Sequence, residues 1–158
     1  MHGWVKLNCD GSFSPDGRAG SGFILRDEHG MVIFSACRQF FFCRDALDAE
    51  LGGCMEGLSQ DMMRTDLPIA LELESSSAMK MILSRDTDRS IYSSLIEEIK
   101  YLMSLRRTSV TQITCCQNKV CDSLASFARL EGRTMTWLGD VPPSALEFYE
   151  QDYNPYMV

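Results

Sequence analysis

The feature of this chain that most constrains its fold is a change in the spacing of apolar residues near residue 45. Before that point apolar and polar side chains alternate, as in WVKLNCDGSF (4–13), which indicates strands with one buried face. After it, apolar side chains recur every three or four residues and mark one stripe of a helix: Leu47, Leu51, Cys54 and Leu58. We therefore expect a sheet that forms first and is then covered by helices.

The expected elements follow one another in the order βββαβααβα, with one more short helix at the end. Strands at 4–13, 22–27 and 31–40 are joined by tight turns and predict an antiparallel meander. The remaining segments predict helices over 45–62, 76–85, 91–105, 118–132 and 145–151 and strands over 68–75 and 109–116. Because parallel strands need helical crossovers, we expect an α/β fold. Its mixed five-stranded sheet would combine the meander with parallel strands and be flanked by helices.

Composition limits the partners and the compartment. No repeat, linker or low-complexity tract interrupts residues 1–158, so a single domain is expected. A net charge of −7 argues against tight binding of nucleic acid by the whole surface, although a local basic patch or a bridging metal is compatible with it. Without an apolar span or a signal peptide, we expect an intracellular protein of the nucleus or cytoplasm with no membrane contact. The sequence does not specify an oligomeric state.

The seven cysteines are expected to be reduced. Their number is odd and most of them lie in apolar segments, where a thiol behaves as a small hydrophobic group. No CxxC pair or Cys/His cluster has the spacing of zinc ligands. The cysteines therefore predict neither a disulfide framework nor a structural zinc site.

Four acidic residues occupy positions that core packing alone would not select. Asp10 lies near the end of the first strand, Glu50 lies beside the apolar stripe of the first helix, Glu74 ends a strand, and Asp122 follows Asn118 by one helical turn. Strand ends and helix starts are the places where an α/β sheet gathers a site. If these carboxylates converge, their repulsion requires a counter-charge, and oxygen ligands suit Mg²⁺ or Mn²⁺.

Each acid also has a local explanation. Asp10 before a glycine is typical of a turn, and Glu50 is compatible with a solvated helix edge. Glu74 and Asp122 would both complement the positive end of a helix dipole, with Asn118 as an N-cap. Taken one at a time, none of the four defines a site.

The order of the motifs distinguishes these readings. The segments VKLNCDGSF, DALDAELGGCMEGL, IALELESSSAMKMI and NKVCDSLASFARLEGRTMTWLG together resemble the ribonuclease H type 1 family. They are most similar to its plant, retroelement-derived, reverse-transcriptase-like branch, from about residue 4 to residue 139. The resemblance implies that Asp10, Glu50, Glu74 and Asp122 bind two divalent metal ions, Mg²⁺ or Mn²⁺, and form the catalytic set.

The same resemblance implies a substrate and its contacts. Two cations held by carboxylates can activate a water on one side of a phosphodiester and stabilise the leaving oxygen on the other. Selection of RNA over DNA requires a contact to the 2′-hydroxyl. Residues that follow the first Asp approach the RNA strand in this family, which predicts substrate contacts at Gly11 and Ser12. Asn118 is a further predicted substrate contact.

The chain departs from the family pattern in several places. Position 74 is Glu where the family usually has Asp, and the loop directly before the last motif has no histidine, because the two histidines, His2 and His29, are far from it in sequence. The loop before that motif is also short, and there is no basic protrusion for gripping a hybrid. Arg106 and Arg107 are expected to complement a helix dipole rather than to bind phosphate, and QFFFC (39–43) to be buried under the first helix rather than to stack bases.

Two functions follow from these observations. The first is a divalent-metal-dependent endonuclease that hydrolyses the RNA strand of RNA/DNA hybrids. The second is a catalytically degenerate module of the same fold that binds nucleic acid or a protein partner. A retroelement fragment with no retained role is a third reading that the sequence leaves open.

Overall fold

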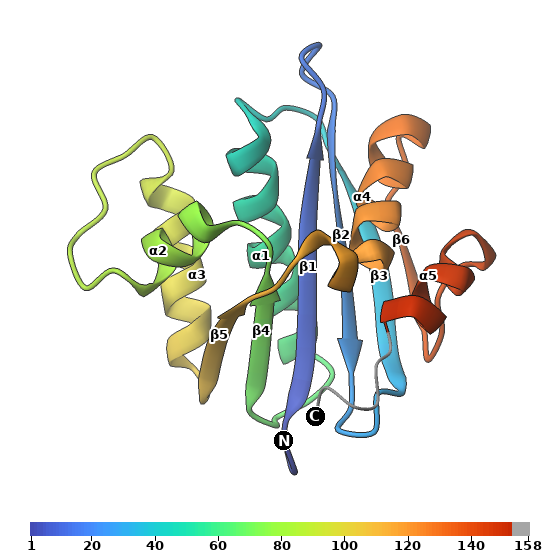
Figure 1. The fold of residues 1–158 in the computed structure, drawn as a ribbon. Helices are drawn as coiled ribbons and strands as arrows, with labels where there is room; N and C mark the ends of the chain where they lie inside the picture. Colours follow the sequence, from blue (N-terminus) through green and yellow to red (C-terminus); the bar gives the residue numbers. More distant parts are fainter. Residues whose placement is uncertain (153–158) are drawn as a thin grey trace.

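The computed structural model describes residues 1–152 and contains a central sheet with helices on both faces (Figure 1). Its strands are β1 (Val5–Phe13), β2 (Ala19–Arg26), β3 (Val32–Phe40), β4 (Ile69–Leu73), β5 (Thr108–Gln112) and β6 (Met135–Leu138). Its helices are α1 (Ala46–Met62), α2 (Ser76–Leu83), α3 (Ser93–Ser104), α4 (Lys119–Glu131) and α5 (Leu146–Asp152), with short 3₁₀ turns η1 (Cys115–Gln117) and η2 (Pro143–Ala145). Among these residues no helix is both long and apolar enough to cross a membrane.

The strand order β5-β4-β1-β2-β3-β6 confirms the predicted mixed sheet. β1, β2 and β3 pair antiparallel as a meander, while β4 and β5 add parallel strands on the other side of β1. The predicted count of five strands was one too low, because β6 pairs antiparallel with β3 at the far edge. β6 has only four residues and none of its side chains is fully buried, so it lacks the alternation that identifies a strand.

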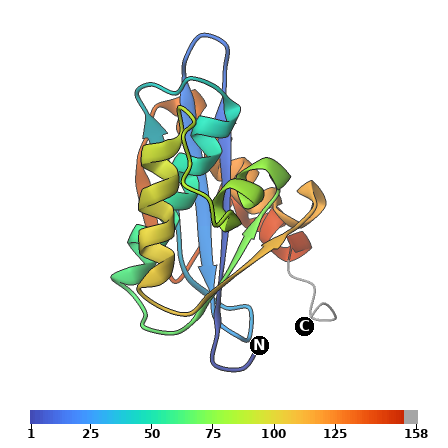
Figure 2. The same cartoon turned by 90° about the vertical axis from the view of Figure 1, so that its left-hand side faces the viewer.

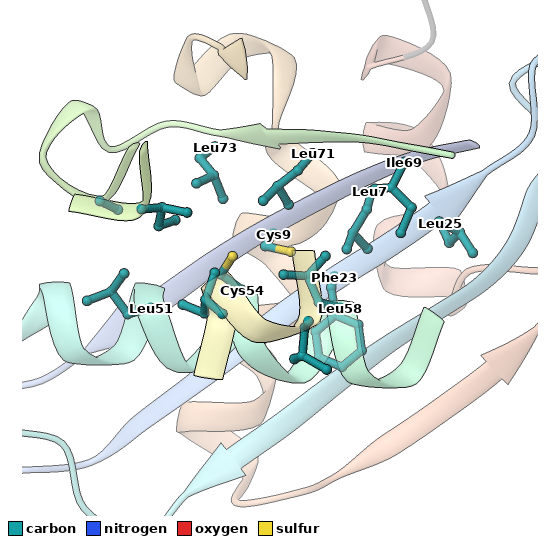
Figure 3. Close-up of a cluster of buried hydrophobic side chains, with 14 of the residues drawn as sticks. Leu7, Cys9, Phe23, Leu25, Leu51, Cys54, Leu58, Ile69, Leu71 and Leu73 are labelled. Atoms are coloured by element: carbon teal, nitrogen blue, oxygen red, sulfur yellow. The ribbon is translucent and has the colours of Figure 1, made fainter. Parts of the chain in front are cut away.

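Two apolar layers hold the helices against the sheet, as Figure 2 shows with α1 and α3 on one side and α4 on the other. The larger layer lies between α1, α3 and the sheet. Figure 3 shows part of it: Leu7, Cys9, Phe23, Leu25, Leu51, Cys54, Leu58, Ile69, Leu71 and Leu73. Alternate residues of β2 turn to the opposite layer, where Ile24 packs with Leu124 of α4. The sheet is therefore buried on both faces around β1.

The glycines of α1 allow this helix to lie unusually close to the sheet. A Cβ at Gly53 would come within 2.9 Å of both the Asp10 carbonyl oxygen and the Ser21 Cβ, and one at Gly57 within 2.9 Å of the Cys9 Sγ. A glycine inside a helix costs about 1 kcal/mol relative to alanine. Close packing against β1 and β2 therefore explains why glycines occupy these positions of the helix.

Two local expectations were wrong. Phe40 packs beneath α1, but Phe41 and Phe42 are 95% and 73% exposed in the segment that leads to that helix, so QFFFC is only partly buried. The strand expected over 109–116 ends at Gln112, and the chain then forms η1. Both differences fall in or next to connecting segments, where the sequence does not show which side chains will be buried or where a strand ends.

The arginines after α3 stabilise the fold instead of complementing a helix dipole. Arg106 reaches the fully buried Asp61 of α1, forms an ion pair with its carboxylate and donates to the carbonyl oxygen of Thr65 at 2.6 Å. The Arg107 guanidinium lies 5.3 Å from the centre of the Trp4 ring. α3 has already ended at Ser104, so neither arginine lies in its last turn.

Candidate active site

The parallel pairing of β1 with β4 places two of the predicted acids at one level. The registered pairs end at Asn8 and Glu72, and Asp10 and Glu74 each lie two residues further along their strands. β1 continues to Phe13, whereas the chain leaves β4 after Leu73 and enters α2. The two acids therefore meet where the strands diverge. Asp10 is inside a strand, opposite Gly22 of β2, so it is not the turn residue that its neighbouring glycine suggested.

Close contact between β1 and α1 adds Glu50. A Cβ at Gly11 would lie 2.4 Å from the backbone nitrogen of Glu50, so only glycine fits at this point of the strand. The Glu50 carboxylate accepts a hydrogen bond of 3.0 Å from the backbone N–H of Ser75, immediately after Glu74. Glu50 is consequently a half-buried residue that joins α1 to the end of β4, not a solvated one.

The start of α4 closes the fourth side of the site. Asn118 is buried. Its side chain was expected to cap α4 but makes no capping hydrogen bond. Instead its Nδ2 donates to the carbonyl oxygen of Cys9 at 3.0 Å, beside Asp10, and its side chain also hydrogen bonds to Glu74. This contact fixes the first turn of α4, in which Asp122 is exposed.

A fifth acid, Asp152, was missed by the sequence analysis. Its carboxylate at the end of α5 accepts hydrogen bonds from the backbone N–H groups of Lys119 at 3.1 Å and Val120 at 2.8 Å, so it performs the capping that Asn118 was expected to provide. The Arg26 guanidinium lies 4.0 Å from it. The predicted last helix stopped at residue 151, and an acid at the end of a short helix gives no local signal of such a contact.

The four predicted acids interact electrostatically. Burial raises the pKa of Asp10 to about 8, and the negative charges of Glu74, Glu50 and Asp122 add to this effect, although the Gly11 N–H opposes it. The pKa of Glu50 is raised by burial and, to a smaller extent, by Glu74. The pKa of Glu74 is also raised, first by burial and then by Asp122 and Asp152, while Asn118 lowers it. Among the described residues, no basic side chain contributes to these three shifts, so the negative charge of the cluster is not compensated there.

The four acids offer only carboxylate oxygens, which are the ligands that a hard divalent cation prefers. In addition, the buried side-chain oxygen of Asn118 has no hydrogen-bond partner among the described residues. The acidic side chains, however, are not arranged around one point as the ligands of a bound metal ion would be. Within residues 1–152 no group of three or more His, Cys, Asp or Glu side chains is arranged to hold a metal ion. The chemistry of the residues fits Mg²⁺ or Mn²⁺, and binding would require the carboxylates to move together.

The predicted substrate contacts lie on β1 beside the acids. Gly11 permits the close approach to α1, and the Ser12 hydroxyl accepts a hydrogen bond of 2.8 Å from Nε of Arg129 on α4. Arg129 was not a sequence candidate, and it places a positive charge next to the predicted contact to RNA. The roles of Gly11, Ser12 and Asn118 in binding a substrate stay predictions.

The histidines lie away from these acids. His2 and His29 both lie beside Glu28, at 2.8 Å and 3.6 Å, next to the turn between β2 and β3. The loop from β5 to α4 contains Cys115 and Cys116 where active relatives were expected to have a histidine. Neither histidine is therefore placed to shuttle a proton at the carboxylates.

This architecture, with acids on β1, on α1, directly after β4 and on α4, is a ribonuclease H-like fold of type 1. The family model described as "Reverse transcriptase-like" matches residues 8–128. The chain belongs to this reverse-transcriptase-like family, which confirms that part of the resemblance seen in the sequence, whereas the plant, retroelement-derived origin stays a prediction. No curated protein matches the chain.

Solved structures agree with this fold. Ribonuclease H1 of Halobacterium salinarum NRC-1 has a TM-score of 0.75 at 19% identity, with 83% of this chain and 100% of that chain covered. The N-terminal ribonuclease H domain of a Mycobacterium tuberculosis protein has a TM-score of 0.73 at 21% identity, with 80% and 93% covered. LC11-RNase H1, solved in complex with an RNA/DNA hybrid, has a TM-score of 0.72 at 15% identity, with 81% and 98% covered.

Proposed function

We propose that this chain is a divalent-metal-dependent endonuclease that hydrolyses the RNA strand of RNA/DNA hybrids. The observation that carries the proposal is the gathering of four acids at one place beside the sheet: Asp10 on β1, Glu50 on α1, Glu74 directly after β4 and Asp122 on α4. A fold does not need such an uncompensated cluster for stability, because like charges at short range oppose folding. LC11-RNase H1, which has the same fold, was solved in complex with an RNA/DNA hybrid, and this complex supports a hybrid as the substrate.

Asp10, Glu50, Glu74 and Asp122 would hold Mg²⁺ or Mn²⁺ through their oxygen atoms. When bound, the metal ions activate the attacking water and stabilise the leaving oxygen. The protein's own residues supply the negative charge and the positions: Asn118 orients Glu74, and the Ser75 N–H orients Glu50. Ser12 and Arg129 would contact the sugar and phosphate of the RNA strand.

The experiment that tests this proposal is cleavage of a labelled RNA/DNA hybrid with Mg²⁺ or Mn²⁺, compared with D10N. We expect cleavage by the wild type, a loss of at least about 100-fold in D10N, and no cleavage with EDTA. The matched control is D16N, because Asp16 lies in the exposed β1–β2 turn where it pairs with Arg18. Equal rates for wild type and D10N would contradict the proposal.

A second function is favoured by two observations at the same site. Glu74 replaces the shorter acid of the family, and the carboxylates of residues 1–152 are not closed around a metal position. They favour a degenerate module that binds nucleic acid or a protein without cleaving. Binding of a hybrid that weakens with salt and leaves the RNA intact in Mg²⁺ and Mn²⁺ would support the nucleic-acid form of this alternative. Absence of binding at low salt would leave a protein partner.

A further inference from the structure

Cys115 and Cys116 are adjacent on η1, and both are exposed. The other five cysteines are buried. We propose that Cys115 and Cys116 form a dithiol site that binds a thiophilic ligand able to accept two thiolates on one atom, of which trivalent arsenicals are the chemical class. The binding itself is independent of the nuclease activity.

The turn that carries these cysteines holds the two thiols together. Adjacent side chains on a strand point to opposite faces, so the predicted extension of the strand to residue 116 would have separated them. β5 ends at Gln112, and the change to a 3₁₀ turn brings the Cys115 and Cys116 side chains into a mutual hydrogen bond. The chelating pair is therefore formed before any ligand arrives.

Hydrogen bonds on both sides keep this turn in place. The side-chain oxygen of Gln117 accepts from the backbone N–H of Thr114 at 3.0 Å and from its hydroxyl at 3.1 Å. The backbone N–H of Asn118 donates to the Cys115 carbonyl oxygen at 3.2 Å. A preorganised pair of thiols loses less conformational entropy on chelation than two independent side chains do.

The dithiol lies between the carboxylates and a cavity. Cys115 interacts electrostatically with Glu74, and Cys116 lines a cavity of about 870 Å³ together with Gln112, Gln117 and Asp152. A ligand that bridges both sulfur atoms would therefore lie beside the acid that ends β4. Its effect on hydrolysis, unlike its binding, rests on the proposed function.

The reaction with phenylarsine oxide balances without an oxidant. Two arsenic–sulfur bonds form, the arsenic–oxygen bond breaks, and the oxygen leaves as water with the two thiol protons. Each of the two thiols supplies one of these protons. Arsenic keeps its oxidation state of three throughout.

Phenylarsine oxide and intact-protein mass spectrometry of the reduced, folded chain test the site. We expect one arsenical per chain, removed by a dithiol but not by an equal concentration of a monothiol. C115S and C116S should each weaken binding at least about tenfold, because chelation needs both sulfurs. C43S is the matched control, since Cys43 is buried. Binding that is unchanged in either single variant, or absent from the wild type, would overturn the proposal.

Hydrolysis of the hybrid is the second readout. If the wild type cleaves, the adduct should slow cleavage at least about tenfold, and C115S should be insensitive to the reagent at the same concentration. An unchanged wild-type rate at full occupancy would contradict the placement of the ligand beside Glu74. If the wild type does not cleave, the proposed function fails while the mass measurement still decides the dithiol site.

Discussion

The carboxylate of Asp152 accepts a hydrogen bond of 2.8 Å from the backbone N–H of Val120. This contact joins the end of α5 to the first turn of α4, the turn that also carries Asn118 and Asp122. The first four N–H groups of a helix have no partner within the helix, and a buried acid that accepts two of them stabilises its start. α5 thus helps to set the position of the fourth acid of the candidate site.

Replacement of Asp152 by alanine should destabilise the fold by about 1–2 kcal/mol, the usual value of a helix cap. The measurement is urea unfolding followed by circular dichroism. E150A is the control, because Glu150 lies exposed on the same helix and should change stability by less than about 0.5 kcal/mol. Equal stability of D152A and E150A would show that the cap does not support α4.

The family and the mixed sheet could be predicted, because the order of the motifs and the spacing of apolar residues are read directly from the chain, whereas the roles of the four acids stay predictions. Alternation over Val5 to Cys9 identifies β1, and the acids stand out because they interrupt apolar periods. Asp152 could not be predicted, because its partner is 32 residues away and neither residue has an unusual local pattern. The exposure of Phe41 could not be predicted either, because its sequence neighbours are apolar and only the path of the backbone decides whether its side chain points to the core or to solvent.

Shortening Glu74 to aspartate should improve the site. Mg²⁺ requires nearly octahedral geometry, and Glu extends its carboxylate by one methylene beyond the acid that the family usually has. We expect E74D to lower the half-saturating Mg²⁺ concentration for hybrid cleavage by about tenfold, equivalent to about 1.4 kcal/mol. E72D is the control, because Glu72 lies two residues earlier, on β4, and pairs with Lys6 and Asn8 instead. A higher requirement for Mg²⁺ in E74D would show that the site is adapted to the longer acid.

Alanine at Gly53 should push α1 away from β1. The added Cβ would meet the Asp10 carbonyl oxygen at 2.9 Å, and overpacking of this kind costs about 1–3 kcal/mol. In an isolated helix alanine is more stable than glycine, so the substitution alone would stabilise α1. A net loss of stability would therefore come from the clash with the Asp10 carbonyl oxygen. Urea unfolding measures it, with S59A on the exposed side of α1 as the control. A more stable G53A would mean that α1 can move without cost.

The pair of Asp61 and Arg106 should make stability depend on pH. Burial raises the pKa of Asp61 to about 7 against the lowering effect of Arg106, while the unfolded chain has a value near 3.8. The folded state therefore binds the proton more tightly, and this contribution to stability is present below about pH 4 and is lost as pH rises to about 7.

Replacement of Arg106 by glutamine should steepen that dependence. It removes the counter-charge, so the pKa of Asp61 rises further and the loss continues above pH 7. Breaking a buried ion pair costs about 3–5 kcal/mol, and we expect most of this cost at pH 8 and little at pH 5. Urea unfolding at both pH values measures it. The double variant D61N/R106Q, which leaves no buried charge at this position, should recover stability at pH 8; an equal loss in R106Q at pH 5 and pH 8 would show that the carboxylate does not titrate in this range.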